Sequence, residues 1–271
     1  MLEKWRRLPT NHQSAGRQLA LSESLLAFPL DRPAFYWYKA TEPAFILGAA
    51  QNPNILEFAT CKKAGYAVYK RTSGGALVLA SSNFLSLDVL LPPTSQLANP
   101  DVTKAYRWFG ECWQQTLARF GVATSLVTPD EARYARQNLV TDLVKLVCFG
   151  TLSSYEVATL DRRKLVGFAQ IKRRTGSLLQ AGLHWHWPAY EFSHFLDLTD
   201  HEKVVLSQQL TQQAVGLVEL VIPPPIPEQI CQVFEENLQA HWSVEWEDDQ
   251  WSDQELAIAE QWAETKFARL T

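Results

Sequence analysis

The chain has 271 residues, of which 46% are hydrophobic and 20% are charged, the balance of an ordinary folded protein. Its formal net charge of -4 gives no reason to expect binding to nucleic acid through bulk charge. The N-terminal segment lacks an uninterrupted apolar stretch, and no apolar run reaches the length of about 18 residues that a membrane-spanning helix needs. The composition therefore predicts a globular protein that neither crosses a membrane nor carries a secretory signal.

The first third of the chain predicts one helix followed by strands. Residues 17–28 are rich in Leu and Ala and end near two prolines, which indicates a helix. Two runs rich in aromatic and aliphatic residues, 34–40 and 44–50, read as strands, and 54–64 reads as a helix. Three further strand candidates joined by tight turns predict an antiparallel meander: 65–72, 74–81 and 83–92.

The remainder alternates in the same way. An apolar stripe at spacings of three and four predicts a helix over 101–120. Four more segments are typical of strands: 143–149, 155–160, 164–171 and 177–186. Three helices are expected near the end of the chain: 200–216, 226–239 and 253–268.

These elements predict an α/β (α+β) fold in which mostly antiparallel, mixed sheets are flanked by helices. The proline run 223–225 marks a junction. We expect a catalytic-type domain over residues 1–222 and a C-terminal helical extension, 223–271, packed on the same domain.

Cys148 is the first residue that offers chemistry. Four cysteines lie far apart, without a CxxC pair or a histidine at ligand spacing, which favours free thiols in the cytoplasm and predicts no metal site. Cys148 lies at the end of the apolar run 143–149. We expect this run to be a strand that holds the thiol rigidly beside a cleft. The alternative is a small buried hydrophobic residue, which we expect for Cys61, Cys112 and Cys231 inside helices.

Four other features stand out, and the first two can each be interpreted in two ways. The segment 70–75 (KRTSGG) is either a ligand-binding loop with Arg71 beside it or a hairpin turn. Lys164 either points toward a bound carbonyl or ends a strand in solvent. The basic run 172–174 is expected at a hairpin tip. His184 and His186 would share one face of a strand, but no third metal ligand is evident.

Taken in order, several segments resemble the lipoate-protein ligase A and octanoyltransferase family, which shares the fold of the biotin-protein ligase catalytic domain. They are RQLALSESLLAF, FYWYKATEPAFILGAAQNP, KRTSGGALVL, VCFGTLSSYEV and RRKLVGFAQIKRRTGSLLQAG. The block from VCFGTLSSYEV onward looks most like the cysteine-dependent octanoyltransferases of the LipM and LipL type. The resemblance extends over residues 4 to 268.

The resemblance implies roles for particular residues. Cys148 matches the nucleophile that carries the acyl chain, and Lys164 matches a substrate-contacting lysine. Further matches suggest substrate-binding residues in two segments: Arg71, Ser73, Gly74 and Gly75 in the first, and Gly167, Ala169 and Gln170 in the second. The chain departs from the family pattern at Ala80 and Ala181, where histidines are common, and at Phe168, which is bulky enough to narrow a pocket.

The implied activity is acyl transfer in protein lipoylation. An octanoyl or lipoyl group would move from an acyl carrier protein thioester to Cys148 and then to a lysine of a lipoyl domain, such as glycine cleavage H protein or a 2-oxoacid dehydrogenase E2. No cofactor, nucleic acid or membrane is implied, and a monomer is expected. The alternatives are an ATP-dependent lipoate-protein ligase, against which the short segment after residue 222 argues, and a non-catalytic binding protein on the same fold.

Overall fold

A computed structural model describes residues 2–270 and contains two β-sheets. The large sheet has the strand order β12-β1-β3-β7-β11-β10-β9-β8, with β2 paired to β3, and the small sheet has the order β5-β4-β6. The strands are β1 (Glu3–Arg7), β2 (Asn11–Gln13), β3 (Ala34–Ala40), β4 (Ala44–Leu47), β5 (Ala67–Lys70), β6 (Val78–Ala80), β7 (Phe84–Leu91), β8 (Thr124–Leu126), β9 (Val157–Thr159), β10 (Lys164–Arg173), β11 (Gly176–His184) and β12 (Val244–Asp248).

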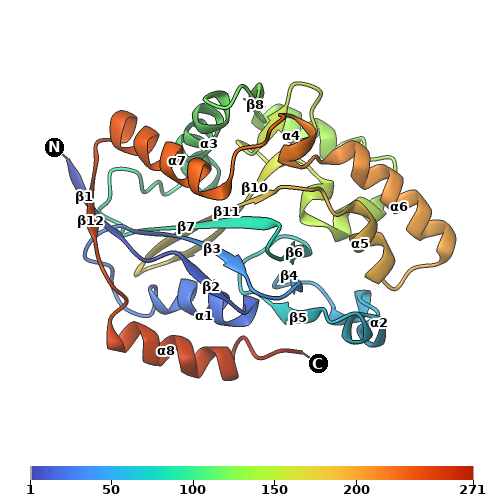
Figure 1. The fold of residues 1–271 in the computed structure, drawn as a ribbon, viewed down its shortest axis with the longest axis horizontal. Coiled ribbons are helices and arrows are strands. Elements are labelled where there is room, and N and C mark those ends of the chain that lie inside the picture. Colours follow the sequence, from blue (N-terminus) through green and yellow to red (C-terminus); the bar gives the residue numbers. More distant parts are fainter. Residues whose placement is uncertain (1, 271) are drawn as a thin grey trace.

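Helices cover both faces of the large sheet. In Figure 1, α3 and α7 lie above this sheet, α1 and α8 lie below it, and α5 and α6 lie beside the small sheet. The α-helices are α1 (Ala15–Ser24), α2 (Phe58–Lys63), α3 (Val102–Ala118), α4 (Pro129–Gln137), α5 (Ala189–Phe195), α6 (Asp200–Gln213), α7 (Pro227–Trp242) and α8 (Asp253–Glu264), and the short 3-10 helices are η1 (Pro53–Ile55), η2 (Asp142–Leu146), η3 (Cys148–Gly150) and η4 (Leu217–Glu219). This arrangement confirms the predicted mixed α/β fold class.

The central strand β7 shows why the large sheet is covered by helices on both faces. All eight of its residues are buried, so the strand FLSLDVLL lacks the alternation of a strand that has one face in water. β7 pairs antiparallel with β3 on one side and with β11 on the other. Because helices cover both faces, a nearly continuous apolar run is stable there.

The predicted antiparallel meander over residues 65–92 is wrong. β5 pairs parallel with β4, β6 pairs antiparallel with β4, and β7 leaves the small sheet to become a central strand of the large one. The parallel pair is possible because η1 and α2 form a crossover between β4 and β5. The fully buried β7 needs a partner strand on each side, and β3 and β11 supply them.

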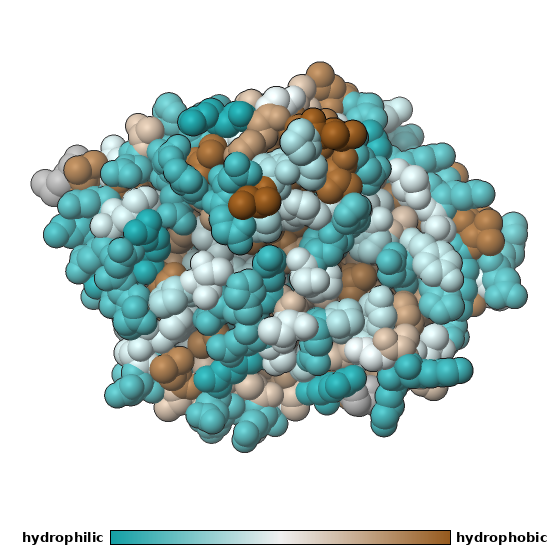
Figure 2. Space-filling model, in the orientation of Figure 1, coloured by the Kyte–Doolittle hydropathy of each residue, from teal (hydrophilic) through white to brown (hydrophobic). Residues whose placement is uncertain are grey.

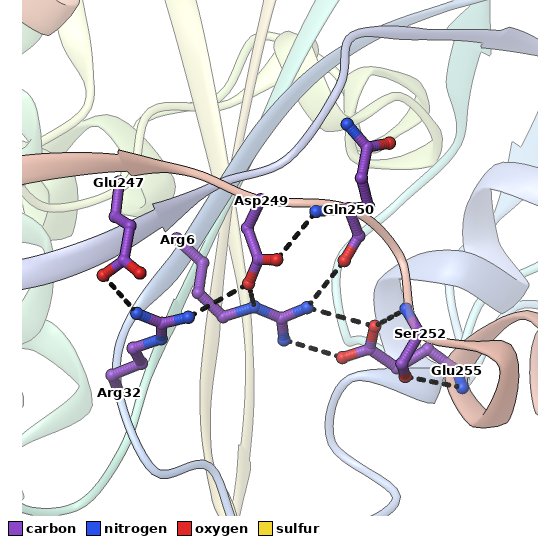
Figure 3. A network of polar contacts seen from close by, with 7 residues as sticks. All are labelled: Arg6, Arg32, Glu247, Asp249, Gln250, Ser252 and Glu255. Atoms are coloured by element: carbon purple, nitrogen blue, oxygen red, sulfur yellow. Dashed lines mark hydrogen bonds and ion pairs between the residues drawn. The ribbon is translucent and has the colours of Figure 1, made fainter.

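The segment after residue 222 contains α7, β12 and α8, so a strand interrupts the expected helices. β12 pairs parallel with β1 at the edge of the large sheet. Figure 3 shows the polar network that fixes it: Arg6 donates to Asp249 and Glu255, each at 2.7 Å, and Arg32 donates to Asp249 at 3.1 Å. The network fastens the chain between β12 and α8 to the first strand.

α8 in turn packs against α1, the helix that closes one side of the main pocket. Lys266, just after α8, pairs with the buried carboxylate of Glu23 at 2.7 Å, and Arg173 and Thr72 also donate to Glu23. Three segments remote in sequence therefore meet at one buried carboxylate on α1, which fixes the position of that helix.

Hydrophilic side chains cover most of the face shown in Figure 2, where the hydrophobic ones gather only in small groups. Among residues 2–270 no helix combines the length and the apolar character that crossing a bilayer requires.

Candidate active site

A pocket lies between α1, the small sheet and the face of the large sheet that α1 covers. It encloses about 650 Å³, its open mouth included. Its apolar lining consists of Ala15, Leu19, Ala40, Ile46, Val78, Ala80, Phe84, Phe149, Gly167, Phe168, Ala169, Ala181 and Gly182, and its polar lining consists of Gln18, Tyr38, Arg71, Ser86, Cys148 and Gln180. A mostly apolar wall with a few polar groups is typical of a site for a hydrophobic ligand.

Cys148 reaches this pocket from a turn and not from the predicted strand. Residues 142–146 and 148–150 form the 3-10 helices η2 and η3, and only Val147 bridges to Leu77 in the manner of a strand. The tight turn depends on Gly150, because a Cβ atom there would lie 2.1 Å from the carbonyl oxygen of Val144. An apolar run of this length has the same pattern whether it is a buried strand or a buried turn.

The thiol of Cys148 lies beside Gly75 and Arg71. A Cβ atom built on Gly75 would lie 3.9 Å from Cys148 Sγ and 2.7 Å from Arg71 Nη2, so both groups flank one point next to the Gly75 α-carbon. Gly75 has a φ of +98°, a conformation that favours glycine. Arg71 also donates to the carbonyl oxygen of Ala76 at 3.1 Å, which fixes its side chain near the thiol. Arg71 therefore places a cationic side chain next to the thiol of Cys148.

Lys164 lies behind the cysteine and is not one of the pocket-lining residues. Its ammonium pairs with Glu156 at 2.7 Å and donates to the carbonyl oxygen of Cys148 at 2.8 Å, and both charged side chains are almost completely buried. Glu156 also accepts the backbone N–H groups of Ser153 at 2.7 Å and Phe168 at 3.1 Å. The buried pair therefore ties the turn of Cys148 to the start of β10.

The other residues that the sequence analysis singled out fall into two groups. Gly167 and Ala169 line the pocket, as do Ala80 and Ala181, the positions where the resemblance leads one to expect histidines. Ser73, Gly74 and Gln170 are not pocket-lining residues. Gln170 follows Ala169 on β10 and so faces the opposite side of the sheet.

Phe168 borders the pocket, but its ring packs on the other side of the sheet and does not narrow the cavity. The ring stacks on Tyr106 with centroids 5.6 Å apart and lies 5.0 Å from the ring of Phe109, both on α3. α3 covers the opposite face of the large sheet (Figure 1). The expected narrowing is therefore wrong, because the side chain of Phe168 belongs to the other core.

The remaining cysteines are poor nucleophiles. Cys61 and Cys112 are buried, and burial raises the pKa of the Cys61 thiol to about 11 and the pKa of the Cys112 thiol well above its usual range. Burial also raises the pKa of Cys231. These thiols stay protonated near neutral pH, whereas Cys148 is half-buried and lines the pocket.

His184 is enclosed by aromatic rings and is not part of a metal pair. Its ring lies 4.3 Å from Phe84, 5.2 Å from Phe149 and 5.3 Å from Trp187, measured between centroids. Burial lowers the pKa of His184 to about 3, so the imidazole is neutral near neutral pH. His186 lies beyond the end of β11.

The sequence analysis missed a buried acid on the pocket side of the sheet. Asp88, in the middle of β7, accepts hydrogen bonds from Tyr36 at 3.2 Å, Tyr38 at 3.3 Å and Gln180 at 3.1 Å. Burial raises the pKa of Asp88 to about 6 despite these donors. The available signal was an aspartate inside an otherwise apolar strand, which is rare unless the carboxylate has partners.

The chain matches the model of the lipoyl protein ligase A/B catalytic domain over residues 14–239. The chain belongs to this family. The match includes the strands, the turn of Cys148 and the helix α1 that enclose the pocket. It confirms the family that the sequence segments resemble.

Two curated relatives are octanoyltransferases named LipM. The protein from Bacillus subtilis (strain 168) is 24% identical, with 98% of this chain and 96% of that protein covered. The protein from Carboxydothermus hydrogenoformans is 27% identical, with 67% of this chain and 64% of that protein covered.

Solved structures of lipoate-protein ligases share the fold. A bipartite lipoate protein ligase of Thermoplasma acidophilum, studied with its E2 lipoyl domain, superposes with a TM-score of 0.77 at 15% identity, covering 98% of this chain and 93% of that chain. A lipoate-protein ligase A bound with ATP superposes with a TM-score of 0.73 at 16% identity, covering 98% of this chain and 95% of that one.

Proposed function

We propose that this protein is an acyltransferase of protein lipoylation that carries an octanoyl or lipoyl group on Cys148. The observation that supports this most directly is a half-buried thiol on the wall of an apolar pocket, with the Arg71 guanidinium beside it. The curated relatives that align with this chain are octanoyltransferases. An apolar pocket can hold the acyl chain, and the thiol can accept the acyl group and pass it on.

In the first step, the Cys148 thiolate attacks the carbonyl carbon of an acyl carrier protein thioester. A carbon–sulfur bond forms to Cys148, the bond to the carrier breaks, and the carrier leaves as its thiolate, which takes up the proton that Cys148 lost when it ionised. One thioester replaces another, so the step needs neither ATP nor a cofactor. The backbone N–H groups of the Gly74–Gly75 turn together with Arg71 stabilise the tetrahedral oxyanion.

In the second step, the ε-amine of a lysine on a lipoyl domain attacks the thioester on Cys148. An amide forms, the carbon–sulfur bond to Cys148 breaks, and Cys148 leaves as its thiol with the proton that the amine loses. Lys164 keeps Cys148 in place through both steps, because its ammonium holds the carbonyl oxygen of that residue.

The reaction assigns two protein partners. The donor is an acyl carrier protein, and the acceptor is a lipoyl domain such as glycine cleavage H protein or a 2-oxoacid dehydrogenase E2. The Thermoplasma ligase, which has the same fold, was studied with an E2 lipoyl domain. We place the enzyme in the cytoplasm as a monomer, where both partners are accessible and thiols stay reduced.

Intact-mass spectrometry tests the proposal. The protein is incubated with octanoyl acyl carrier protein without ATP, and peptide mapping then locates the added acyl mass. We expect the adduct on Cys148, and we expect Cys148→Ser to abolish transfer to a lipoyl domain. Cys231→Ser is the matched control, because Cys231 is also partly exposed but lies on α7, and it should retain full transfer. An adduct on another residue would contradict the assignment.

An ATP-dependent ligase is the second candidate, because the fold is also that of a ligase bound with ATP. The same assay separates the two activities when free octanoate and ATP replace the carrier thioester. A ligase modifies the lipoyl domain under these conditions and still does so after Cys148→Ser. A protein that binds octanoate but performs neither reaction is a non-catalytic member of the family.

A further inference from the structure

Three alanines from three different elements meet at one corner of the pocket. Ala15 begins α1, Ala40 ends β3 and Ala80 ends β6, and all three line the pocket and are at most 6% exposed. The strand pairings bring them together. Gln13, two residues before Ala15, lies opposite Ala40 in the pairing of β2 with β3. Ala44, which follows Ala40 after a short turn, lies opposite Ala80 in the pairing of β4 with β6. We call Ala15, Ala40 and Ala80 the alanine corner.

The alanine corner and the nucleophile lie at opposite ends of β6. The backbone N–H of Cys148 donates to the carbonyl oxygen of Leu77, directly before β6, at 2.9 Å. Ala80 is the last residue of β6, so the chain covers about 10 Å from Leu77 to Ala80. Val78, between them, also lines the pocket. β6 is therefore a wall that runs from the cysteine to the alanine corner.

The large sheet, on the other side of the pocket, gives the same direction. A Cβ atom on Gly167 of β10 would lie 3.0 Å from the ring of Phe149, the residue after Cys148, so the thiol end of the pocket lies over β10. The strand order β10-β11-β7-β3 places Ala40 three strand spacings away, about 14 Å between backbones. Both walls place the alanine corner at the end of the pocket remote from the thiol.

Buried side chains close the pocket behind the alanine corner. Gly16 follows Ala15, and a Cβ atom there would lie 2.5 Å from Tyr69 Cε1 and 2.8 Å from the carbonyl oxygen of Phe267. Tyr69 and Phe267 belong to the same core cluster as the three alanines. Tyr69 is held in place because its hydroxyl donates to Glu42 at 3.0 Å. A chain that reaches the corner meets a packed wall and cannot extend further.

The length of the pocket matches a particular acyl chain. An extended chain advances about 1.2 Å per bond, so an octanoyl group reaches about 10 Å beyond the sulfur that carries it. This is about the length of the wall that β6 forms. The methyl side chains of the alanine corner leave room for the last carbons, and a larger side chain at any of the three positions would occupy that room.

We propose that Ala15, Ala40 and Ala80 set the length of the acyl chain that the pocket accepts, so that an octanoyl chain fills the pocket to its end. The inference rests on the proposed function and names the residues that give it this chain length. A hexanoyl chain stops before the corner and leaves a void, which forfeits contacts with the wall. A decanoyl chain collides with the wall behind the corner.

The experiment compares the N-acetylcysteamine thioesters of hexanoic, octanoic and decanoic acid, and intact mass follows the rate at which each acylates Cys148. For the wild-type protein we expect kcat/KM to be about tenfold or more higher for octanoyl than for either other chain. Ala40→Val and Ala80→Val fill the corner with a residue that suits a strand. Each should lower kcat/KM for octanoyl about tenfold or more, keep it for hexanoyl, and so reverse the preference.

Ala34→Val is the matched control. Ala34 lies on β3, as Ala40 does, and is fully buried, but it packs in another core cluster and is not a pocket-lining residue. The same two methyl groups there strain the core without filling the pocket. The control should therefore keep the octanoyl preference of the wild-type protein.

Acylation of the wild-type protein by decanoyl as fast as by octanoyl would overturn the inference, as would an equal loss for all three chain lengths in Ala40→Val and Ala80→Val. If no thioester acylates Cys148, the proposed function fails, and titration calorimetry decides the inference separately. Cys148→Ser, with and without Ala40→Val, is titrated with hexanoate, octanoate and decanoate. Tightest binding of octanoate that Ala40→Val shifts to hexanoate supports the inference. The same order in both proteins, or no binding of any acid, refutes it.

Discussion

The buried pair of Glu156 and Lys164 allows a quantitative test of how the nucleophile is held. The side chains of Lys164 and Glu156 are 1% and 2% exposed, so solvent cannot replace either partner. Glu156→Gln keeps the shape of the side chain but leaves the ammonium of Lys164 buried without its counter-charge. Removal of one partner from such a pair costs about 3–5 kcal/mol of unfolding free energy. We expect a loss in this range, small enough for a domain of ordinary stability to remain folded.

The second part of this prediction is a double-mutant cycle. Lys164→Met alone leaves the carboxylate of Glu156 buried with its two backbone donors. In the double variant no uncompensated charge remains, so its loss should be about 2 kcal/mol or more smaller than the sum of the two single losses. Urea unfolding followed by tryptophan fluorescence gives all four free energies.

An exposed pair provides the control for this cycle. Glu111 pairs with Arg107 at 3.0 Å on the surface of α3, where the side chains are 37% and 67% exposed. Glu111→Gln should cost less than about 1 kcal/mol, because solvent compensates the lost partner. If Glu156→Gln costs no more than Glu111→Gln, or if the cycle shows no coupling, the buried pair does not hold the turn of Cys148.

Two further predictions concern the pocket and its aromatic wall. Gly75→Ala should slow acylation of Cys148 at least tenfold, because the new Cβ would lie 2.7 Å from Arg71 Nη2 and close to the thiol. His184 predicts a pH dependence of stability: with a folded-state pKa of about 3 and an unfolded value of about 6.5, only the unfolded chain binds the proton as pH falls below 6.5. Between pH 7 and pH 4.5 this proton uptake should lower the free energy of unfolding by about 2.5 kcal/mol. The His184→Leu variant should not show this decrease.

Each of these two predictions has a matched control. Gly121 also has a positive φ, +76°, but a Cβ there meets nothing within 4 Å, so Gly121→Ala pays the backbone strain without blocking the site. Equal acylation rates for Gly75→Ala and Gly121→Ala would contradict the placement of the thiol. His241 is exposed, and His241→Leu should keep the pH dependence of the wild-type protein. Urea titrations at pH 7 and pH 4.5 measure both histidine variants.

The family could be recognised from the sequence because its evidence is local. The block around Cys148 and Lys164 stands in one contiguous stretch, and the chain matches the family model over residues 14–239. The hairpin of β10 and β11 was also predictable, since its strands are adjacent and its turn is polar. Short sequence patterns, taken in order along the chain, decided these points.

Only the tertiary structure decided how the parts of the site are arranged. The run ending at Cys148 is a turn because its single strand-like partner is Leu77, which is remote in sequence. Lys164 lies behind the nucleophile because a buried carboxylate, Glu156, holds it there. Asp88 acquires its partners only when β3 and β11 lie on either side of β7. These groups can be read from the sequence, but long-range packing determines which of them meet, and a charge or a hydrogen bond depends on its neighbours in space.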